Sequence, residues 1–173
     1  MIRKFFAASL VVALMSVYSQ SASAQDGFQP GYLDVGPALG LGGVAGVGTS
    51  IGARLEKGIK TLPSMGDGIL GIQAFAQFAS LDRFTIGGSW FFLGATANYH
   101  FKMNDTKFDP FLGLGLGYSN FSWDVDCTGC SSSTINFAGR LGARYFFAEK
   151  LAGYADVGTG GSTINLGVMF KLK

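Results

Sequence analysis

Apolar and polar side chains alternate with a period of two along Thr134–Phe147, and this alternation limits the fold more than any other feature of the sequence. The odd positions of the segment are apolar or glycine, whereas the even positions include Arg140 and Arg144. Side chains that alternate in this way point to opposite faces of a β-strand, so the segment is predicted to be a strand with one apolar face. Thr163–Lys173 repeats the pattern, with its apolar residues at the even positions.

Six further segments carry the same alternation, which brings the expected number of strands to eight. They are Tyr32–Leu41, Thr49–Lys57, Leu70–Ala79, Phe91–Met103, Phe111–Tyr118 and Leu151–Gly158. A membrane-crossing strand needs about 9–11 residues, whereas a typical globular strand has about 5–6. The 27 glycines argue against helices, because each costs roughly 1 kcal/mol relative to alanine inside one. The choice is therefore between a soluble β-sandwich and a membrane barrel.

The character of the two strand faces favours the barrel. A sandwich turns its polar faces to water and should carry many Lys and Glu there, but these faces are rich in Gly, Ser, Thr, Asn and Gln. Aromatic residues gather near the ends of the apolar faces: Tyr99, Phe101, Tyr145, Phe147 and Phe170 at one rim, and Phe78, Phe91 and Tyr118 at the other. Two aromatic belts around an aliphatic band are typical of a lipid-facing surface. The predicted fold is an all-β, eight-stranded, antiparallel up-and-down transmembrane β-barrel.

The amino-terminal segment is predicted to be a cleaved signal peptide over residues 1–24, followed by the barrel domain over residues 25–173. A basic start precedes an apolar run, Phe5–Val17, that is too short to span a bilayer as a helix. Small residues then lead to the expected cleavage after Ala24. A retained amino-terminal anchor is the alternative. Export of this kind is consistent with a place in the outer membrane of a bacterial cell.

Removing the signal peptide changes the charge of the chain. Arg3 and Lys4 are two of its 13 basic residues, so 11 basic and 11 acidic residues remain and the net charge is zero. Nucleic-acid binding thereby loses its main electrostatic support, and no nucleic-acid partner is expected.

Two segments resemble a known family. Phe108-Asp-Pro-Phe-Leu-Gly-Leu-Gly-Leu-Gly-Tyr118 resembles the recurring strand of the small OmpA/OmpX-type outer-membrane barrels. The carboxyl terminus resembles the assembly signal of that class, which Asn165, Gly167, Phe170 and Leu172 would supply, although such chains commonly end on Phe and this one ends on Lys173. The resemblance implies two partners, the outer-membrane lipid and the barrel assembly machinery. It leaves the function open, because one fold serves many functions.

Seven charged residues have the parity of the lumen face. They are Asp34, Arg54, Glu56, Lys102, Arg140, Arg144 and Asp156. They would form either a polar conduit or a network of paired charges that braces a closed barrel. The network is the favoured reading, because eight strands leave an interior just wide enough for side chains. Within it, Arg144 and Asp156 are expected to pair, since a short turn around Glu149-Lys150 joins their strands.

Two other features suggest chemistry, and both have a simpler explanation. Cys127 and Cys130 are predicted to form a disulfide, as two cysteines of an exported chain commonly do, while a redox centre or half a metal site are the alternatives. His100 is the only histidine; the barrels that are lipid A deacylases resemble one another in a His-x-Ser arrangement, whereas Phe101-Lys102 follows here. We therefore expect no enzyme activity, no cofactor and no metal.

The resulting hypothesis is a non-enzymatic outer-membrane barrel that serves envelope structure or surface interaction. An extracellular ligand would bind its outer loops, which are expected at residues 81–90 and 119–133. A porin-like small-solute channel is the alternative, and a lipid-modifying enzyme is a weaker one.

Overall fold

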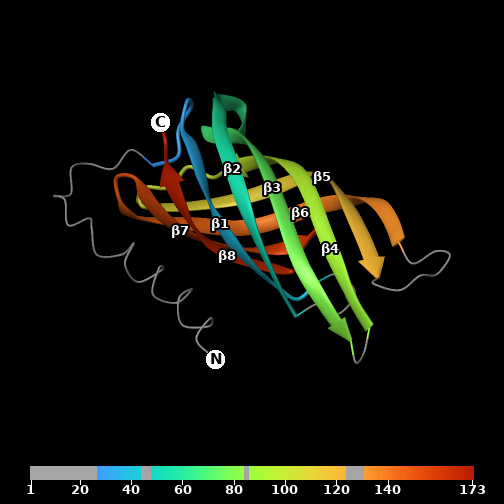
Figure 1. Ribbon diagram of the computed structural model, residues 1–173. Coiled ribbons are helices and arrows are strands. Elements are labelled where there is room, and N and C mark those ends of the chain that lie inside the picture. The colour runs from blue at the N-terminus through green and yellow to red at the C-terminus, as the bar shows by residue number, and fades with distance from the viewer. Residues whose placement is uncertain (1–26, 44–47, 84–85, 124–130) are drawn as a thin grey trace.

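The computed structural model describes residues 27–43, 48–83, 86–123 and 131–173. Its strands are β1 (Leu33–Leu41), β2 (Thr49–Leu62), β3 (Gly68–Arg83), β4 (Ile86–His100), β5 (Phe108–Trp123), β6 (Ser131–Ala148), β7 (Leu151–Thr159) and β8 (Ile164–Lys171). Each strand pairs with its neighbours in the chain, and β1 pairs with β8 to close an antiparallel barrel (Figure 1). The predicted eight-stranded barrel is confirmed. Within the described ranges, no helix has the length and apolar character needed to cross a membrane.

The period of two separates an apolar outer surface from a buried interior. Along β5, for example, Leu112, Leu114 and Leu116 point outward and are 43%, 54% and 61% exposed. The other large exposed side chains of the strands are also mostly apolar: Leu39, Ile51, Leu55, Ile72, Phe78, Phe91, Leu93, Ile135, Phe137, Leu141, Val157, Ile164, Leu166 and Phe170. A continuous apolar surface of this kind needs a partner other than water.

The two ends of the barrel differ in what they carry. At the "terminal end" lie the start of β1, the end of β8 and the β2–β3, β4–β5 and β6–β7 turns (Figure 1). The β2–β3 turn contains a short 3₁₀ helix, η2 (Pro63–Met65), and then Gly66 and Asp67 with φ angles of 80° and 57°. Left-handed backbone at two successive residues reverses the chain tightly there. The opposite end, where the remaining four connections lie, is called the "loop end".

The prediction of outer loops at residues 81–90 and 119–133 is wrong, because most of these residues belong to strands. The β3–β4 ladder continues to Arg83 and Ile86, and the β5–β6 ladder to Ser122 and Ser131. These segments are rich in Ser, Asn and Gly, which disfavour strands on composition, but cross-strand pairing satisfies the backbone groups whatever the side chains are. The parts that are left for connections, residues 84–85 and 124–130, lie outside the described residues.

The extra strand length forms a four-stranded "protruding sheet" at the loop end. Beyond Phe78, β3 pairs with β4 alone, and before Gly139, β6 pairs with β5 alone. The ends of β3 to β6 therefore extend past the rest of the barrel wall (Figure 1).

Candidate functional site

Ionisable side chains fill the middle of the barrel. The structure places six of the seven predicted lumen charges there, each at most 4% exposed: Asp34, Arg54, Glu56, Arg140, Arg144 and Asp156. His100 and Asp109, which are 2% and 5% exposed, complete the set. Burying a charge is costly unless it is paired, so the partners of each group decide whether this interior is stable.

Glu56 is the centre of the group nearest the terminal end. Its carboxylate accepts hydrogen bonds from Asn98 Nδ2 at 2.7 Å and from Gln73 Nε2 at 2.9 Å. Arg144 Nη2 also donates to it, and Arg144 Nη1 donates to Asp34 Oδ2 at 2.7 Å. Charge-assisted bonds of this type are roughly twice as strong as neutral ones. Arg144 thus joins β6 to β1 and β2 across the interior.

His100 lies between two carboxylates. Its Nδ1 atom is 2.9 Å from the Asp109 carboxylate, and its Nε2 atom is 2.8 Å from Glu56 Oε1. Because both ring nitrogens face acceptors, both must donate, which requires the imidazolium form. The interior then holds four carboxylates, four cations and no net charge.

Asp156 is the centre of a second group, nearer the loop end. It accepts from Arg54 Nη1 at 2.7 Å, from Arg140 Nε at 2.8 Å and from Asn165 Nδ2 at 2.9 Å. The guanidinium carbon of Arg54 also lies 4.0 Å from the centre of the Tyr154 ring, within the range of a cation–π contact. Side chains from β2, β6, β7 and β8 therefore meet around one carboxylate in the barrel interior.

The predicted Arg144–Asp156 pair is wrong. Both side chains point inward as expected, but Arg144 stands opposite Tyr154, and Asp156 stands opposite Gly142. A β-bulge between Phe146 and Ala148, next to the turn, sets this register. Arg144 binds carboxylates across the interior instead of one on the adjacent strand.

Lys102 was expected in the lumen, and this expectation is also wrong. β4 ends at His100, so the period of two does not extend to Lys102. Its side chain is 65% exposed at the terminal end, where Nζ lies 3.3 Å from Asp67 Oδ2.

An aromatic cap closes the interior at the terminal end. Phe28, in the segment before β1, stacks on the His100 ring with 3.7 Å between the ring centres. The Arg144 guanidinium carbon lies 4.8 Å from the centre of the same Phe28 ring, and Tyr32 packs beside it. Burial raises the pKa of the Tyr32 hydroxyl well above its usual range, and the nearby Asp34 carboxylate raises it further, so the phenol stays neutral.

A second aromatic cluster fills the interior towards the loop end. Its buried members are Phe75, Ala79, Trp90, Phe92 and Ala138, with Phe121 and Trp123 packed against them. Gly94 makes room for two of these rings, because a Cβ atom there would lie 2.6 Å from Phe92 and 2.7 Å from Phe75. This cluster was not predicted from the sequence, although Phe75 lies on the strand face of Gln73 and Gln77, and Phe92 on that of Thr96 and Asn98.

The other predicted site residues are partly described. Asn165 is buried next to Asp156, Phe170 lies on the outer face at 37% exposure, and Leu172 follows β8 at 60% exposure. Gly167 pairs with Ala38 of β1. The role of these four residues in assembly stays a prediction. Cys127 and Cys130 lie outside the described residues, so the disulfide stays a prediction as well.

Residues 7–169 match the family described as "Outer membrane protein beta-barrel domain". No curated protein sequence matches the chain.

Among solved structures, the fold is similar to Ail, the attachment invasion locus protein of Yersinia pestis, with a TM-score of 0.57 and 14% identity over 83% of this chain and 96% of that one. It is similar to Neisserial surface protein A, with a TM-score of 0.53 and 14% identity over 82% and 96% of the two chains. It is also similar to the N-terminal β-barrel domain of Pseudomonas aeruginosa OprF, with a TM-score of 0.51 and 16% identity over 83% and 98%.

Proposed function

The chain belongs to the outer-membrane β-barrel family, and from this premise we propose that it is a non-enzymatic surface component of the bacterial cell envelope that acts through its loop end. The filled interior is the observation that carries the proposal. The cavity between Arg54, Arg140, Asp156, Phe75 and Tyr154 measures about 10 Å³. This is about the space that one water molecule needs, so the interior supports a closed barrel better than a solute channel.

The surroundings of His100 support a non-enzymatic role. A general base needs a free nitrogen within reach of a nucleophile and a substrate. Both nitrogens of His100 are held by carboxylates, and the ring is 2% exposed beneath Phe28. The histidine is thereby suited to hold the interior together rather than to turn over a substrate.

The two ends of the barrel suggest its orientation. An even number of strands returns the chain to the side where it began, so the start of β1 and the end of β8 lie together. A chain exported through the periplasm would leave both termini there and expose the loop end to the outside. The protruding sheet would then extend beyond the membrane, where a surface ligand can reach it. Two similar structures carry names that describe attachment and a surface location.

Cysteine labelling on intact cells tests this orientation. In a background with Cys127→Ser and Cys130→Ser, we expect Ser131→Cys at the loop end to react with a membrane-impermeant maleimide. Lys150→Cys, at a position that is also exposed but lies at the terminal end, is expected to react only after the cells are permeabilised. The reverse pattern of labelling would overturn the proposed orientation, and equal labelling of both in intact cells would argue against a barrel that spans the membrane.

A further inference from the structure

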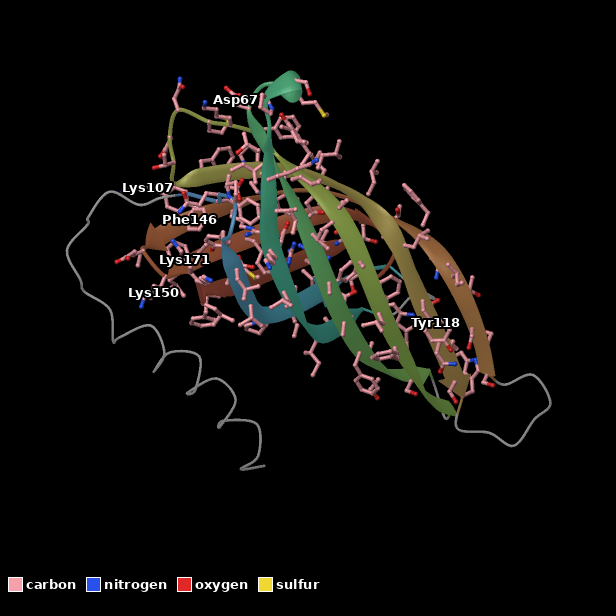
Figure 2. The ribbon with its side chains drawn as sticks, turned by 90° about the horizontal axis from the view of Figure 1, so that it is seen from above. Asp67, Lys107, Tyr118, Phe146, Lys150 and Lys171 are labelled. Atoms are coloured by element: carbon pink, nitrogen blue, oxygen red, sulfur yellow. The ribbon has the colours of Figure 1, made fainter. Side chains whose placement is uncertain are left out.

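The charged side chains outside the barrel interior have an uneven distribution. Asp82 and Arg83 lie at the end of β3 at the loop end. The other charged residues of the described ranges outside the interior lie at the terminal end: Lys57, Lys60, Lys102, Lys107, Lys150, Lys171 and Lys173, with Asp67, Asp105 and Glu149. We call the seven lysines the "lysine rim". Figure 2 shows Lys107, Lys150, Lys171 and Asp67 at this end and Tyr118 at the other. Among the described side chains at this end, seven ammonium groups stand against three carboxylates, which gives an excess of positive charge.

Within the described part of the chain, most of the lysine rim has no counter-ion. Lys102 pairs with Asp67, at 3.3 Å between Nζ and Oδ2. For the other six lysines, the described residues place no carboxylate oxygen within 4.0 Å. The Asp105 carboxylate is engaged by its own turn, where it accepts from the backbone N–H of Lys107 at 2.9 Å. The rim therefore carries positive charge that is largely not neutralised by carboxylates of the described residues.

Four of these lysines lie within three residues of outward-facing aromatic residues at the strand ends. Lys102 follows Phe101, Lys107 precedes Phe108, Lys150 comes three residues after Phe147, and Lys171 follows Phe170. The four aromatic side chains are between 37% and 57% exposed. Aromatic belts mark the level at which the hydrocarbon of a membrane meets its headgroups. Lysines placed just beyond such a belt extend their ammonium groups into the headgroup layer.

We propose that the lysine rim binds the phosphate groups of anionic phospholipids in the periplasmic leaflet. The aromatic belt sets the depth, the ammonium groups supply the charge, and the flexible lysine stems adapt to mobile headgroups. Two of these ammonium groups also have partners in the protein, because Lys102 pairs with Asp67 and Lys171 Nζ lies 5.4 Å from the centre of the Tyr32 ring. The rim would in this way fix the height of the barrel in the membrane. The choice of leaflet rests on the proposed orientation, whereas the preference for anionic phospholipid does not.

The test measures lipid association with the full barrel. The wild-type protein is reconstituted in phosphatidylcholine vesicles that contain a trace of spin-labelled phosphatidylglycerol or of spin-labelled phosphatidylcholine. At low ionic strength we expect about a fivefold preference for the anionic lipid, the effect of one lysine close to its headgroup. The preference should fall towards one as salt is added, because salt screens exposed charges.

Two matched variants identify the rim as the cause. Changing Lys102, Lys107, Lys150 and Lys171 together to Gln should lower the preference, because only three of the seven rim lysines remain, whereas changing the same four to Arg should keep it. Heat-dependent gel mobility reports whether each variant is folded. If the fourfold Gln variant does not fold, Lys102→Gln with Lys107→Gln, and Lys150→Gln with Lys171→Gln, are measured as separate pairs and each should lower the preference.

Other outcomes would overturn the proposal. These are an equal association of both lipids with the wild type, or an undiminished preference in the folded Gln variants. If the protein shows no lipid preference but sediments with isolated peptidoglycan in a way that depends on these lysines, the rim binds an acidic polymer instead. Because both leaflets of these vesicles have the same composition, an inverted barrel gives the same result, so the labelling experiment on cells tests the orientation separately.

Discussion

Replacing Glu56 by Gln is expected to lower the free energy of unfolding of the barrel by about 3–5 kcal/mol, the cost of removing one partner from a buried ionic network. The side chain is fully buried, and Arg144, His100, Gln73 and Asn98 all direct donors at its carboxylate. The Gln side chain has the same shape, so it creates no cavity. It removes the charge that Arg144 and His100 require, and its amide N–H₂ faces donors.

Urea unfolding of the protein refolded in lipid vesicles measures this loss. Glu149→Gln is the matched control, because that glutamate is exposed in the β6–β7 turn and its change should shift stability by less than about 0.5 kcal/mol. Equal stability of the two variants would show that the interior network does not hold the barrel together as described.

Arg144 is expected to couple strongly to Asp34 and weakly to Asp156. Arg144→Met alone should cost about 3–5 kcal/mol, because it leaves the Asp34 and Glu56 carboxylates buried without their guanidinium. Once Asp34 is changed to Leu, the cost of Arg144→Met should be smaller, because one of the stranded charges is absent. Contacting residues show interaction energies of roughly 0.5–3 kcal/mol in such cycles.

A parallel cycle with Asp156→Leu is the control for this measurement. Asp156 belongs to the group held by Arg54 and Arg140. The losses of stability caused by Asp156→Leu and Arg144→Met should therefore be closer to additive. A larger interaction energy for Arg144 with Asp156 than with Asp34 would contradict the observed register of β6 against β7.

The strand faces were predictable from the sequence because the side-chain period of a strand is two. Once Arg140 and Arg144 are assigned to the interior, every second residue of β6 must follow them. The same reasoning placed Asp34, Arg54 and Glu56 correctly, since apolar neighbours mark the opposite face of each strand. The face on which a side chain lies is determined within one strand, so the alternation of residues along that strand is enough to predict it.

The partners of the buried charges were not predictable in the same way. Arg144 binds Asp34 and Glu56, which are 110 and 88 residues away in the sequence and lie on strands that are not its neighbours. Pairing across the lumen depends on the tilt of the strands and on the bulge beside the β6–β7 turn. Neither feature can be predicted from the sequence of a single strand. The prediction considered only residues on the adjacent strand, and it therefore chose Asp156 as the partner of Arg144.

The inward aromatic residues carried a signal that the sequence reading did not use. Phe75 lies between Gln73 and Gln77, and Phe92 has the same parity as Thr96 and Asn98. Their parity places them inside the barrel, but the expectation of a polar lumen drew attention to the charges alone. The glycines that face these rings, such as Gly94, show that large and small residues alternate to fill the interior.

Single-channel recording in planar lipid bilayers tests most directly whether the interior is closed. The described interior is occupied from Phe28 at the terminal end, through the two charged groups, to the cluster around Phe92 at the loop end. Wild-type protein, refolded and shown by gel mobility to be a barrel, should produce no current steps above those of the bare bilayer. Reproducible, stable openings that scale with the amount of folded protein would contradict the closed interior and favour the solute channel.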